Sequence, residues 1–425
     1  MLPPSPQDWL PEDHLAYFVS ETVDQLDLSG FYAPYRGDGR RNRPFDPAMM
    51  VKILIYCYAT GSFSSRKIAR RLHEDVAVRV LAAGNFPAHR TLAEFRQRHR
   101  KEFRELFVQV VRIAGEAGLV QLGRVAVDGC KVKANASKHK AMSYGRMVQE
   151  EKRLEEEIEQ LLEQAQRVDE AEDERYGEQN RGDELPQELR RREGRLEKIR
   201  EAKRRVEQRQ AEADRQRGRH RGDGRKSPRG GRNFKRDFGV PEQKAQENFT
   251  DPESRIMKSS GEFQQCYNTQ AAVDEESQII LAAEVSNNAA DNGQLLPLLD
   301  AVEENVRGRP EQLVADAGYK SEDNFAALEQ RQIDAYIALG REGKKPVRAE
   351  TLPATARMSG KLAGESGRAV YRRRKAIVEP VFGWIKQVLG FRSFSLRGLE
   401  KVQCEWMLVC LALNLKRMKG RLHTC

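Results

Sequence analysis

Apolar residues recur at helical spacing over about the first 120 positions. The pair Asp46-Pro47 suits an N-cap followed by a first-turn proline, and a helix is predicted after it. The apolar face of that helix comprises Met50, Ile53, Leu54 and Cys57. A second helix is predicted from Ser64, and the pattern Thr91-x-x-Glu94 predicts a capping box that opens a longer helix reaching residue 118. The N-terminal part is therefore expected to be all helical.

From Gly123 onward the pattern changes to strands that alternate with helices. Short apolar runs predict one strand in 123–133, two in 265–286, and one each at 312–316 and 335–339. Helical spacing predicts helices at 291–306 and 324–332. This alternation indicates an α/β domain with a sheet that is at least partly parallel.

The segment from about 140 to 250 has a different pattern. Two runs of apolar residues follow heptad-like spacing: Leu154, Ile158, Leu161 and Val168, and then Leu189, Leu196, Ile199 and Val206. Glycine and proline lie between the runs, at 177–186, which is the expected turn. The spacing predicts an antiparallel helical hairpin inserted into the α/β domain.

Charge changes this picture by favouring an acidic partner. Charged residues make up 32% of the chain, and the net charge is +10. Between Arg215 and Arg236, ten Arg or Lys residues accompany one Asp. Such a tract is typical of polyanion binding. Its candidate DNA contacts are Arg217, Arg219, Arg221 and Arg225. The alternative interpretation is a solvated linker that contacts nothing.

A second group of basic residues shares the helix predicted from Ser64. Its members are Arg66, Lys67, Arg70 and Arg71. Short helices with a basic face and tight Gly or Pro turns fit a helix-turn-helix-like DNA-binding unit. An ordinary helical packing domain explains the same pattern, so both interpretations stay open.

Cysteine usage and hydropathy exclude several classes of protein. The six cysteines form no CxxC pair and the seven histidines are scattered, which predicts reduced thiols rather than a zinc site. The first residues, MLPPSPQDWLPEDH, lack the basic and apolar regions of a signal peptide. No run approaches the ~20 apolar residues of a membrane span. We therefore expect a soluble, cytoplasmic protein without a membrane partner.

Three acidic residues lie in settings that suit a metal site. Asp128 and Asp316 each end an apolar run, which predicts that they lie at strand ends. Glu379 lies in an amphipathic helix over 371–386 with apolar neighbours, which predicts that it points toward the core or its edge. Three such carboxylates can hold two divalent cations about 3.5–4 Å apart, an arrangement that suits chemistry on a phosphodiester. Taken singly, an aspartate after an apolar run is often a helix cap, and a glutamate on a helix is ordinarily a solvated charge. For Asp128 the following residues argue against a cap, because Gly129 is predicted to begin a turn and Lys131, Lys133 and Lys138 supply cations close by.

Taken together, the motifs around these residues are more specific. The blocks VAVDG, VADAGY and VEPVFGWIKQVLGFRSFSLRG occur in this order. With them, the chain from about Pro44 to Lys416 resembles the DDE transposases of bacterial insertion sequences that carry a Tyr-Arg-Glu-Lys signature. The resemblance makes Asp128, Asp316 and Glu379 the catalytic metal ligands. It also makes Lys386, Tyr371 and Arg374 contacts to DNA.

One spacing departs from the family pattern. Four residues separate Arg374 from Glu379, whereas the family has three between its arginine and glutamate. Either Lys375 takes the place of the arginine, or the register differs by one residue.

The resemblance also implies an architecture and a reaction. It implies an all-α DNA-binding domain over 1–120 and an RNase H-like α/β catalytic domain over 121–425, interrupted by the helical insert at 140–250. The reaction would be cleavage at the ends of an insertion sequence, followed by attack of the freed 3′-hydroxyl on target DNA. Two Mg²⁺ ions, with Mn²⁺ as a substitute, would serve both steps. The partners would be terminal inverted repeats, target DNA and a second copy of the chain, in a nucleoid-associated complex.

Two other functions fit the same motifs. One is a DNA-binding protein that descends from such an enzyme and has lost its activity. The other is a metal-dependent nuclease that cuts DNA without joining strands.

Overall fold

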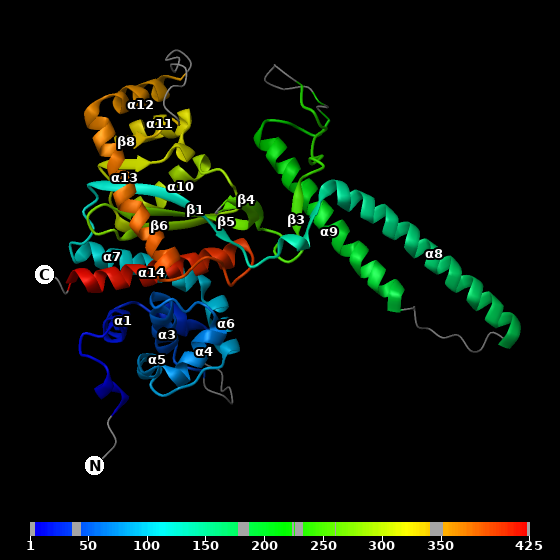
Figure 1. The fold of residues 1–425 in the computed structure, drawn as a ribbon, viewed down its shortest axis with the longest axis horizontal. Helices are drawn as coiled ribbons and strands as arrows, with labels where there is room; N and C mark the ends of the chain where they lie inside the picture. The colour runs from blue at the N-terminus through cyan, green and yellow to red at the C-terminus, as the bar shows by residue number, and fades with distance from the viewer. Residues whose placement is uncertain are drawn as a thin grey trace. The chain divides into compact units, whose positions relative to one another are not determined.

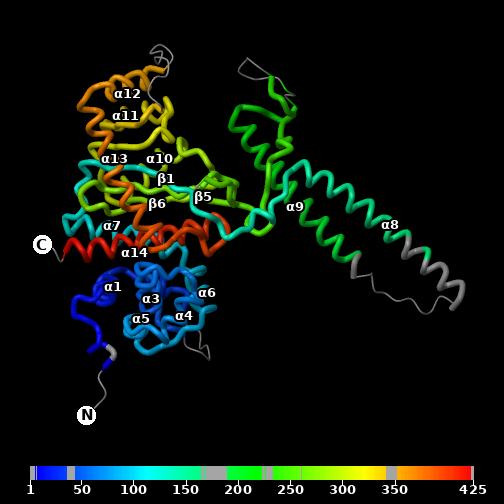
Figure 2. Tube along the Cα trace, in the orientation of Figure 1, coloured from blue at the N-terminus to red at the C-terminus, as the bar shows by residue number. Residues whose placement is uncertain are grey.

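The computed structural model describes residues 5–35, 44–176, 187–222, 225, 233–259, 261–340 and 352–422. The chain forms two compact units. One comprises residues 1–135 and 256–425, and the other comprises residues 136–255. The first contains the N-terminal helices and a large sheet, and the second contains the insert (Figures 1 and 2).

The N-terminal residues form short helices, as predicted. These are α1 (Leu15–Asp24), α2 (Ser29–Tyr32), α3 (Pro47–Ala59), α4 (Ser65–Glu74), α5 (Val76–Leu81), α6 (His89–Arg98) and α7 (Arg100–Glu116). Asp46 caps α3 as expected, since its carboxylate accepts a hydrogen bond from the Met49 amide at 2.8 Å. The capping box at Thr91 was a wrong prediction. The helix already begins at His89, and a break at His99 separates α6 from α7.

A mixed six-stranded sheet lies at the centre of the first unit. Its strands are β1 (Arg124–Lys133), β4 (Arg255–Ser259), β5 (Glu262–Asp274), β6 (Ile280–Ser286), β7 (Gln312–Ala315) and β8 (Asp334–Ile337). β5 pairs antiparallel with both β1 and β6, whereas β1, β7 and β8 run parallel. The order β6-β5-β1-β7-β8 with only β5 reversed is that of an RNase H-like sheet, which confirms the predicted fold class.

Helices cover this sheet and complete its core. α10 (Leu295–Val306) packs on β5 and β6, while α11 (Glu322–Gln330) and α12 (Pro353–Ala363) pack near β8. α13 (Glu365–Gly383) crosses β1, β7 and β8 and continues into a π-helical turn, Trp384–Val388. α14 (Leu399–Leu422) lies between β6 and the N-terminal helices α3 and α7, and it is buried over most of its length (Figure 1).

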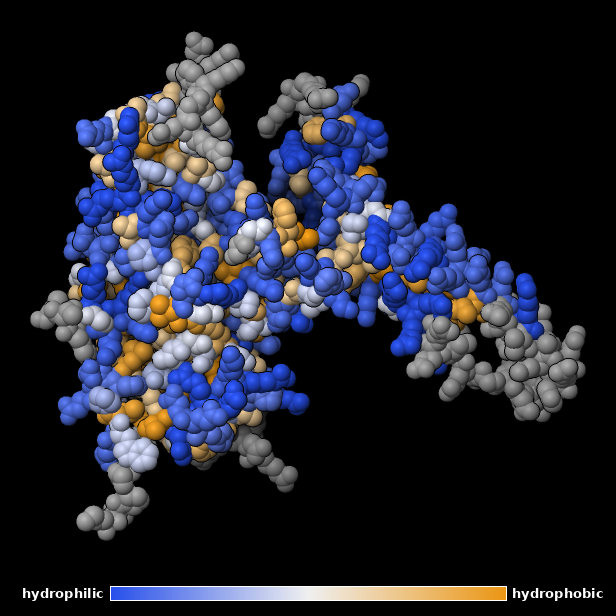
Figure 3. Space-filling model, in the orientation of Figure 1, coloured by the Kyte–Doolittle hydropathy of each residue, from blue (hydrophilic) through white to orange (hydrophobic). Residues whose placement is uncertain are grey.

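The insert is built on a helical hairpin, as predicted. α8 (Tyr144–Tyr176) and α9 (Gln187–Gln216) pack against each other, beside a small ribbon of β2 (Ala141–Ser143) and β3 (Gln246–Asn248). The buried residues between them are Tyr144, Met147, Leu154, Leu196, Ile199, Ala202 and Val206. The expected turn at 177–186 lies outside the described residues. Figure 3 shows that the visible outer surface of the hairpin is mainly hydrophilic, which fits a seam buried on one side only.

The cysteines and the hydropathy of the helices agree with the composition. Among the described residues, five cysteines are free and buried: Cys57, Cys130, Cys266, Cys404 and Cys410. Within the described ranges, no helix is long and apolar enough to cross a membrane.

Candidate active site

Asp128 and Asp316 are brought together by strand register. β1 and β7 pair in parallel from Arg124↔Gln312 to Val127↔Ala315, so the two aspartates are the next residues on neighbouring strands. Asp316 follows the last residue of β7, as predicted. Asp128, however, does not end its strand. β1 continues to Lys133 because its antiparallel pairing with β5 extends that far, and Gly129, predicted to begin a turn, pairs with Gln270.

The backbone around Asp316 is held by its own side chain. Asp316 Oδ1 accepts a hydrogen bond from the Gly318 amide at 2.7 Å and so caps a short 3₁₀ turn, Ala317–Tyr319. A turn of this kind aims the carboxylate at the end of the sheet, where ligands of α/β folds bind. Asp316 therefore lies in a position suited to a metal or a phosphate.

Arg374, on α13, is the cation of this acidic pair. Its Nη1 lies 2.8 Å from Asp128 Oδ2, and the two side chains are only 11% and 19% exposed. Burial raises the pKa of Asp128 above its ordinary value, and the Arg374 guanidinium opposes that rise. The charge of Asp316 adds to the rise, which agrees with the proximity of the two carboxylates. Arg374 thus contacts Asp128, whereas Lys375 is exposed.

Lys386 and Tyr371 also lie near this pair. Lys386 lies in the π-helical turn, close to Cys130, which is two residues after Asp128 on the same face of β1. Burial raises the pKa of Cys130, and the Lys386 ammonium opposes it. Tyr371 is half-buried on α13, one helical turn before Arg374. Three residues of the signature therefore border one region of the sheet.

Glu379 was predicted to point toward the core or its edge, and it does not lie in the core. It is exposed on α13. Five positions along an α-helix rotate a side chain by about 500°, which places Glu379 some 140° around the helix from Arg374. The buried Val378 occupies the position four residues after Arg374 instead. Glu379 does lie about two turns before Lys386.

The donor atoms of the acidic pair fit a divalent cation in part. Two adjacent carboxylates offer the hard oxygen ligands that Mg²⁺ prefers, and a positive charge already lies against one of them. In the part of the chain that the structure describes, no three His, Cys, Asp or Glu residues are grouped closely enough to hold a metal ion. The structure therefore brings Asp128 and Asp316 together but not Glu379 with them.

Sequence reasoning missed a polar network beside the pair. Asp291 Oδ1 accepts hydrogen bonds from Lys131 Nζ (2.9 Å), Asn268 Nδ2 (2.6 Å) and Gln270 Nε2 (2.9 Å). Gln270 Oε1 accepts a hydrogen bond from the Tyr319 hydroxyl. We call these five residues the Gln270 network. The glycine of the motif VDG and the tyrosine of the motif DAGY could have indicated the Gln270 network, because both motifs contact it. No motif pointed to Asn268 or Gln270.

Two family models match the chain. The "Transposase domain (DUF772)" family matches residues 4–98, and the "Transposase DDE domain" family matches residues 235–415. Together they cover more than half of the chain, in the order that the motifs predicted. The chain belongs to the insertion-sequence DDE transposases. Members of this family bind DNA and generally use divalent metal ions.

The matches divide the site of this transposase. Asp316, Arg374 and Glu379 lie within the DDE match, whereas Asp128 and the α8–α9 hairpin lie between the two matches. Asp128 is therefore tied to the site by strand register rather than by the family match. A comparison with curated proteins finds no match.

The candidate DNA contacts of the N-terminal helices have different surroundings. Arg66 and Lys67 are exposed on α4. Arg70 is also exposed, with Glu74 at 3.8 Å. Arg71 is half-buried and donates to Asp75 at 2.6 Å and to the Thr60 hydroxyl at 2.7 Å. The prediction that Arg71 contacts DNA is corrected, because its guanidinium joins α4 to the end of α3.

The basic tract of the transposase is also divided. Arg219 is buried, with Nη1 3.1 Å from the buried Asp214 and its guanidinium 4.1 Å from the centre of the Phe234 ring. It supports the insert and is not exposed to DNA, which corrects the prediction. Arg217 and Arg221 are exposed, and Arg225 is an exposed partner of Asp237 at 3.0 Å. Residues 223–224 and 226–232 of the tract lie outside the described residues.

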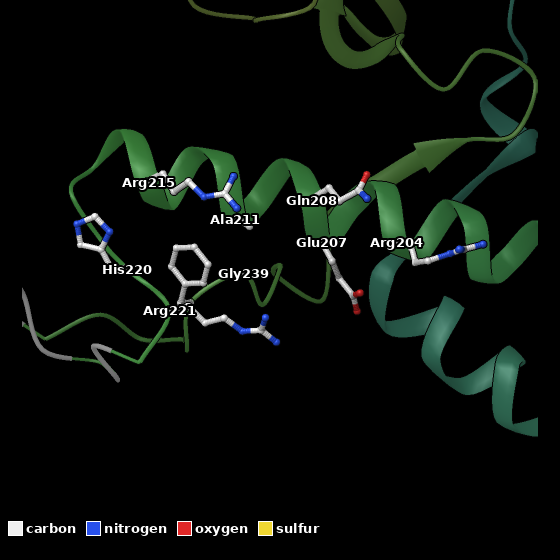
Figure 4. A pocket seen from close by; sticks show the side chains of 9 residues that line it. Arg204, Glu207, Gln208, Ala211, Arg215, His220, Arg221 and Gly239 are labelled. Atoms are coloured by element: carbon white, nitrogen blue, oxygen red, sulfur yellow. The ribbon is translucent and has the colours of Figure 1, made fainter.

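A pocket of about 450 Å³ lies in the insert beside this tract (Figure 4). Its lining includes three guanidinium groups, those of Arg204, Arg215 and Arg221. The rest of the lining consists of Glu207, Gln208, Ala211, His220, Phe238 and Gly239. The pocket contains neither Asp128 nor Asp316, so it is not the catalytic centre. Its charge suits a phosphate group.

Proposed function

We propose that this transposase cleaves DNA at the ends of an insertion sequence and joins the freed 3′-hydroxyl to target DNA, with Asp128, Asp316 and Glu379 as metal ligands. The observation that carries this proposal is the register of β1 and β7, which makes Asp128 and Asp316 neighbours at the point where parallel pairing ends. Two carboxylates in this position, with cations on the adjoining helix, match the needs of phosphoryl transfer.

Asp128 and Asp316 would hold Mg²⁺, or Mn²⁺ in its place. Glu379 would complete the ligand set when DNA brings α13 and the sheet into their reactive arrangement. A pair of bound divalent cations supplies an activated oxygen nucleophile and stabilises the leaving oxygen. The same ligand set serves water in the first step and a DNA hydroxyl in the second.

The other residues of the signature would act on the DNA backbone. Lys386 and Arg374 supply positive charge beside the carboxylates, and Tyr371 adds a hydroxyl donor on the same helix. A phosphate bound next to two carboxylates is repelled by them unless cations neutralise that charge. We assign these three residues to holding the scissile phosphate in place.

Recognition of the terminal repeats is assigned to the helices of residues 1–120, with Arg66, Lys67 and Arg70 as exposed contacts. Arg217, Arg221 and Arg225 of the insert, within 140–250, would add contacts to phosphates without reading bases. Two DNA ends have to be cut in concert for the element to move, which favours a homodimer on the DNA.

Strand cleavage and strand joining test this proposal directly. We expect D128N and D316N each to lose at least about a thousandfold of cleavage on duplexes that carry the terminal repeats, with DNA binding retained. E379Q should behave in the same way. Asp334 provides a matched control, since it lies on β8 of the same sheet and bonds Lys361 at 2.5 Å. D334N should cleave normally.

The same assay separates the other functions. Cleavage without joined products would indicate a nuclease, and repeat-specific binding without any cleavage would indicate a protein that only binds DNA. Normal cleavage by D128N or D316N would remove that residue from the site.

A further inference from the structure

We propose that the Gln270 network positions Asp316, with Tyr319 and Gln270 as the positioning residues. This inference rests on the proposed function, in which Asp316 is a metal ligand. Tyr319 follows Asp316 by three residues and is completely buried. Its hydroxyl donates to Gln270 Oε1, so the loop that begins at Asp316 is tied at its far end to the middle of β5.

The orientation of the Gln270 amide is fixed by its partners. Its Nε2 donates to Asn268 Oδ1 and to Asp291 Oδ1, each at 2.9 Å. Both acceptors lack a proton to give, because a carboxylate only accepts and Asn268 Nδ2 is itself used by Asp291. The opposite flip of the amide would place Oε1 against two oxygens. Gln270 therefore presents its oxygen to Tyr319.

Two motif glycines make room for this network. A side chain at Gly129 would place its Cβ 2.5 Å from Gln270 Nε2. A side chain at Gly318 would place its Cβ 2.9 Å from Asp316 Oδ1 and 3.0 Å from Asp291 Oδ2. The distances of 2.5 Å at Gly129 and 2.9 Å at Gly318 are shorter than the contacts that real Cβ atoms make. The glycines that follow Asp128 and Asp316 are thus explained by one structure, the packing of Gln270 against β1 and of Asp291 against the loop that begins at Asp316.

Asp291 joins the network to the acidic pair. Since one Cβ position at Gly318 lies so near both, Asp291 Oδ2 and Asp316 Oδ1 are within about 6 Å of each other. Three donors from described residues meet Asp291 at its other oxygen, Oδ1. Asn324 fixes the other side of the loop, donating 2.7 Å hydrogen bonds to the carbonyls of Tyr319 and Asn292. Asp316 is therefore held by a loop that is anchored on both sides.

Anchoring of this kind affects metal binding without contact to the metal. Partners that orient a ligand typically contribute 10- to 100-fold in metal affinity. Loss of the Tyr319 hydroxyl removes one anchor, leaves the aromatic ring in the core, and leaves Asp316 chemically unchanged.

The first measurement is hydrogen–deuterium exchange in the full-length Y319F protein. The Gly318 amide, which donates to Asp316 Oδ1, reports on the loop directly. We expect exchange in the peptide that covers 316–320 to rise about tenfold, while peptides of α7 keep the wild-type rate. Y336F is the matched control, because Tyr336 is on β8 and its ring contacts Lys361, with Nζ 4.6 Å from the ring centre. It should leave exchange in 316–320 unchanged.

The second measurement is binding of Mn²⁺ alone, followed by the EPR signal of the free ion. We expect Y319F to bind Mn²⁺ 10- to 100-fold more weakly than the wild type, and Y336F to bind it normally. Q270M, which removes the same acceptor from the other side, should reproduce the Y319F result in both measurements. Binding of repeat DNA without metal should be the same in all four proteins.

The outcomes are distinct. Unchanged exchange in 316–320, or a rise spread over the whole sheet, would overturn the inference. Faster exchange with unchanged Mn²⁺ affinity would reduce the network to a packing feature and overturn its positioning role. A wild type that binds no Mn²⁺ would contradict the proposed function instead, and the exchange measurement would still decide whether the network holds the loop.

Discussion

Arg374 and Asp128 form an ion pair of 2.8 Å between α13 and β1, although the two residues are 246 positions apart along the chain. The pair lies where a divalent cation is proposed to bind. A guanidinium that neutralises Asp128 keeps two neighbouring carboxylates compatible with a folded sheet while no metal is bound. Metal binding then has to compete with Arg374, which becomes available to a DNA phosphate.

Replacing Arg374 with Gln should therefore destabilise the metal-free protein. The expected loss is about 2 kcal/mol, since an unpaired buried carboxylate would remain beside Asp316. Mg²⁺ should restore most of that loss and so raise the free energy of unfolding of R374Q more than that of the wild type. Urea denaturation with and without Mg²⁺ measures both effects. R372Q is the control, because Arg372 is exposed on the same helix. Equal stability of R374Q and R372Q would show that the ion pair contributes nothing.

Metal binding should weaken on the acid side at a higher pH than for an ordinary aspartate. Burial raises the pKa of Asp128, and a ligand has to lose its proton before it binds a metal. The protonated form thus persists above the ordinary pKa of 3.8, and affinity rises with pH as Asp128 ionises. R374Q should move this rise in affinity to higher pH, because the cation that opposes the raised pKa of Asp128 is gone. Mn²⁺ titrations between about pH 4 and 8 measure the shift. A rise in affinity at lower pH in R374Q would contradict the assignment of Asp128 as a metal ligand.

The exposed cations of α4 should contribute to DNA binding, and Arg71 to folding. The double variant R66Q/K67Q should lower affinity for repeat DNA about three- to tenfold at moderate salt and leave the melting temperature unchanged. R71Q should instead destabilise the protein by about 1–2 kcal/mol, because its hydrogen bonds to Asp75 and Thr60 are removed. Fluorescence anisotropy and thermal melts separate the two effects. Loss of affinity in R71Q alone would reverse these roles.

In the basic tract, the exposed arginines should likewise contribute to DNA binding and the buried Arg219 to folding. R217Q/R221Q should reduce the slope of log affinity against log salt by about 0.9 for each phosphate that is no longer neutralised, equally for repeat and random duplexes. R219A should not act on that slope. It should destabilise the insert by about 3 kcal/mol, since Asp214 would be left buried without its partner. An unchanged slope in R217Q/R221Q would make the exposed part of the tract a solvated linker.

Local patterns predicted the N-terminal helices, the hairpin and most strands of the sheet, and they singled out Asp128 and Asp316, which the fold makes neighbours. The heptad spacing predicted the hairpin because its seam is buried along one side of each helix, as Leu154 and Leu196 are. Apolar runs that end in aspartate located Asp128 and Asp316, since a strand buried on both faces reads as a continuous apolar stretch. The order of the motifs was enough for the family.

Tertiary structure decided what those patterns left open. Asp128 lies within β1 because β5, which is distant in sequence, extends its pairing to Lys133. Glu379 is exposed because one extra residue rotates it away from Arg374. The extra residue is visible in the sequence, but the fold shows which side of α13 is buried. In the sequence, Arg219 and Arg71 could not be distinguished from the exposed arginines beside them. In the fold, their contacts to Asp214 and Asp75 give them a structural role. Gln270 and Asn268 gave no signal, because a buried amide acquires its role from partners that are distant in sequence. Charge and periodicity are properties of a segment, whereas burial and partners are properties of the fold.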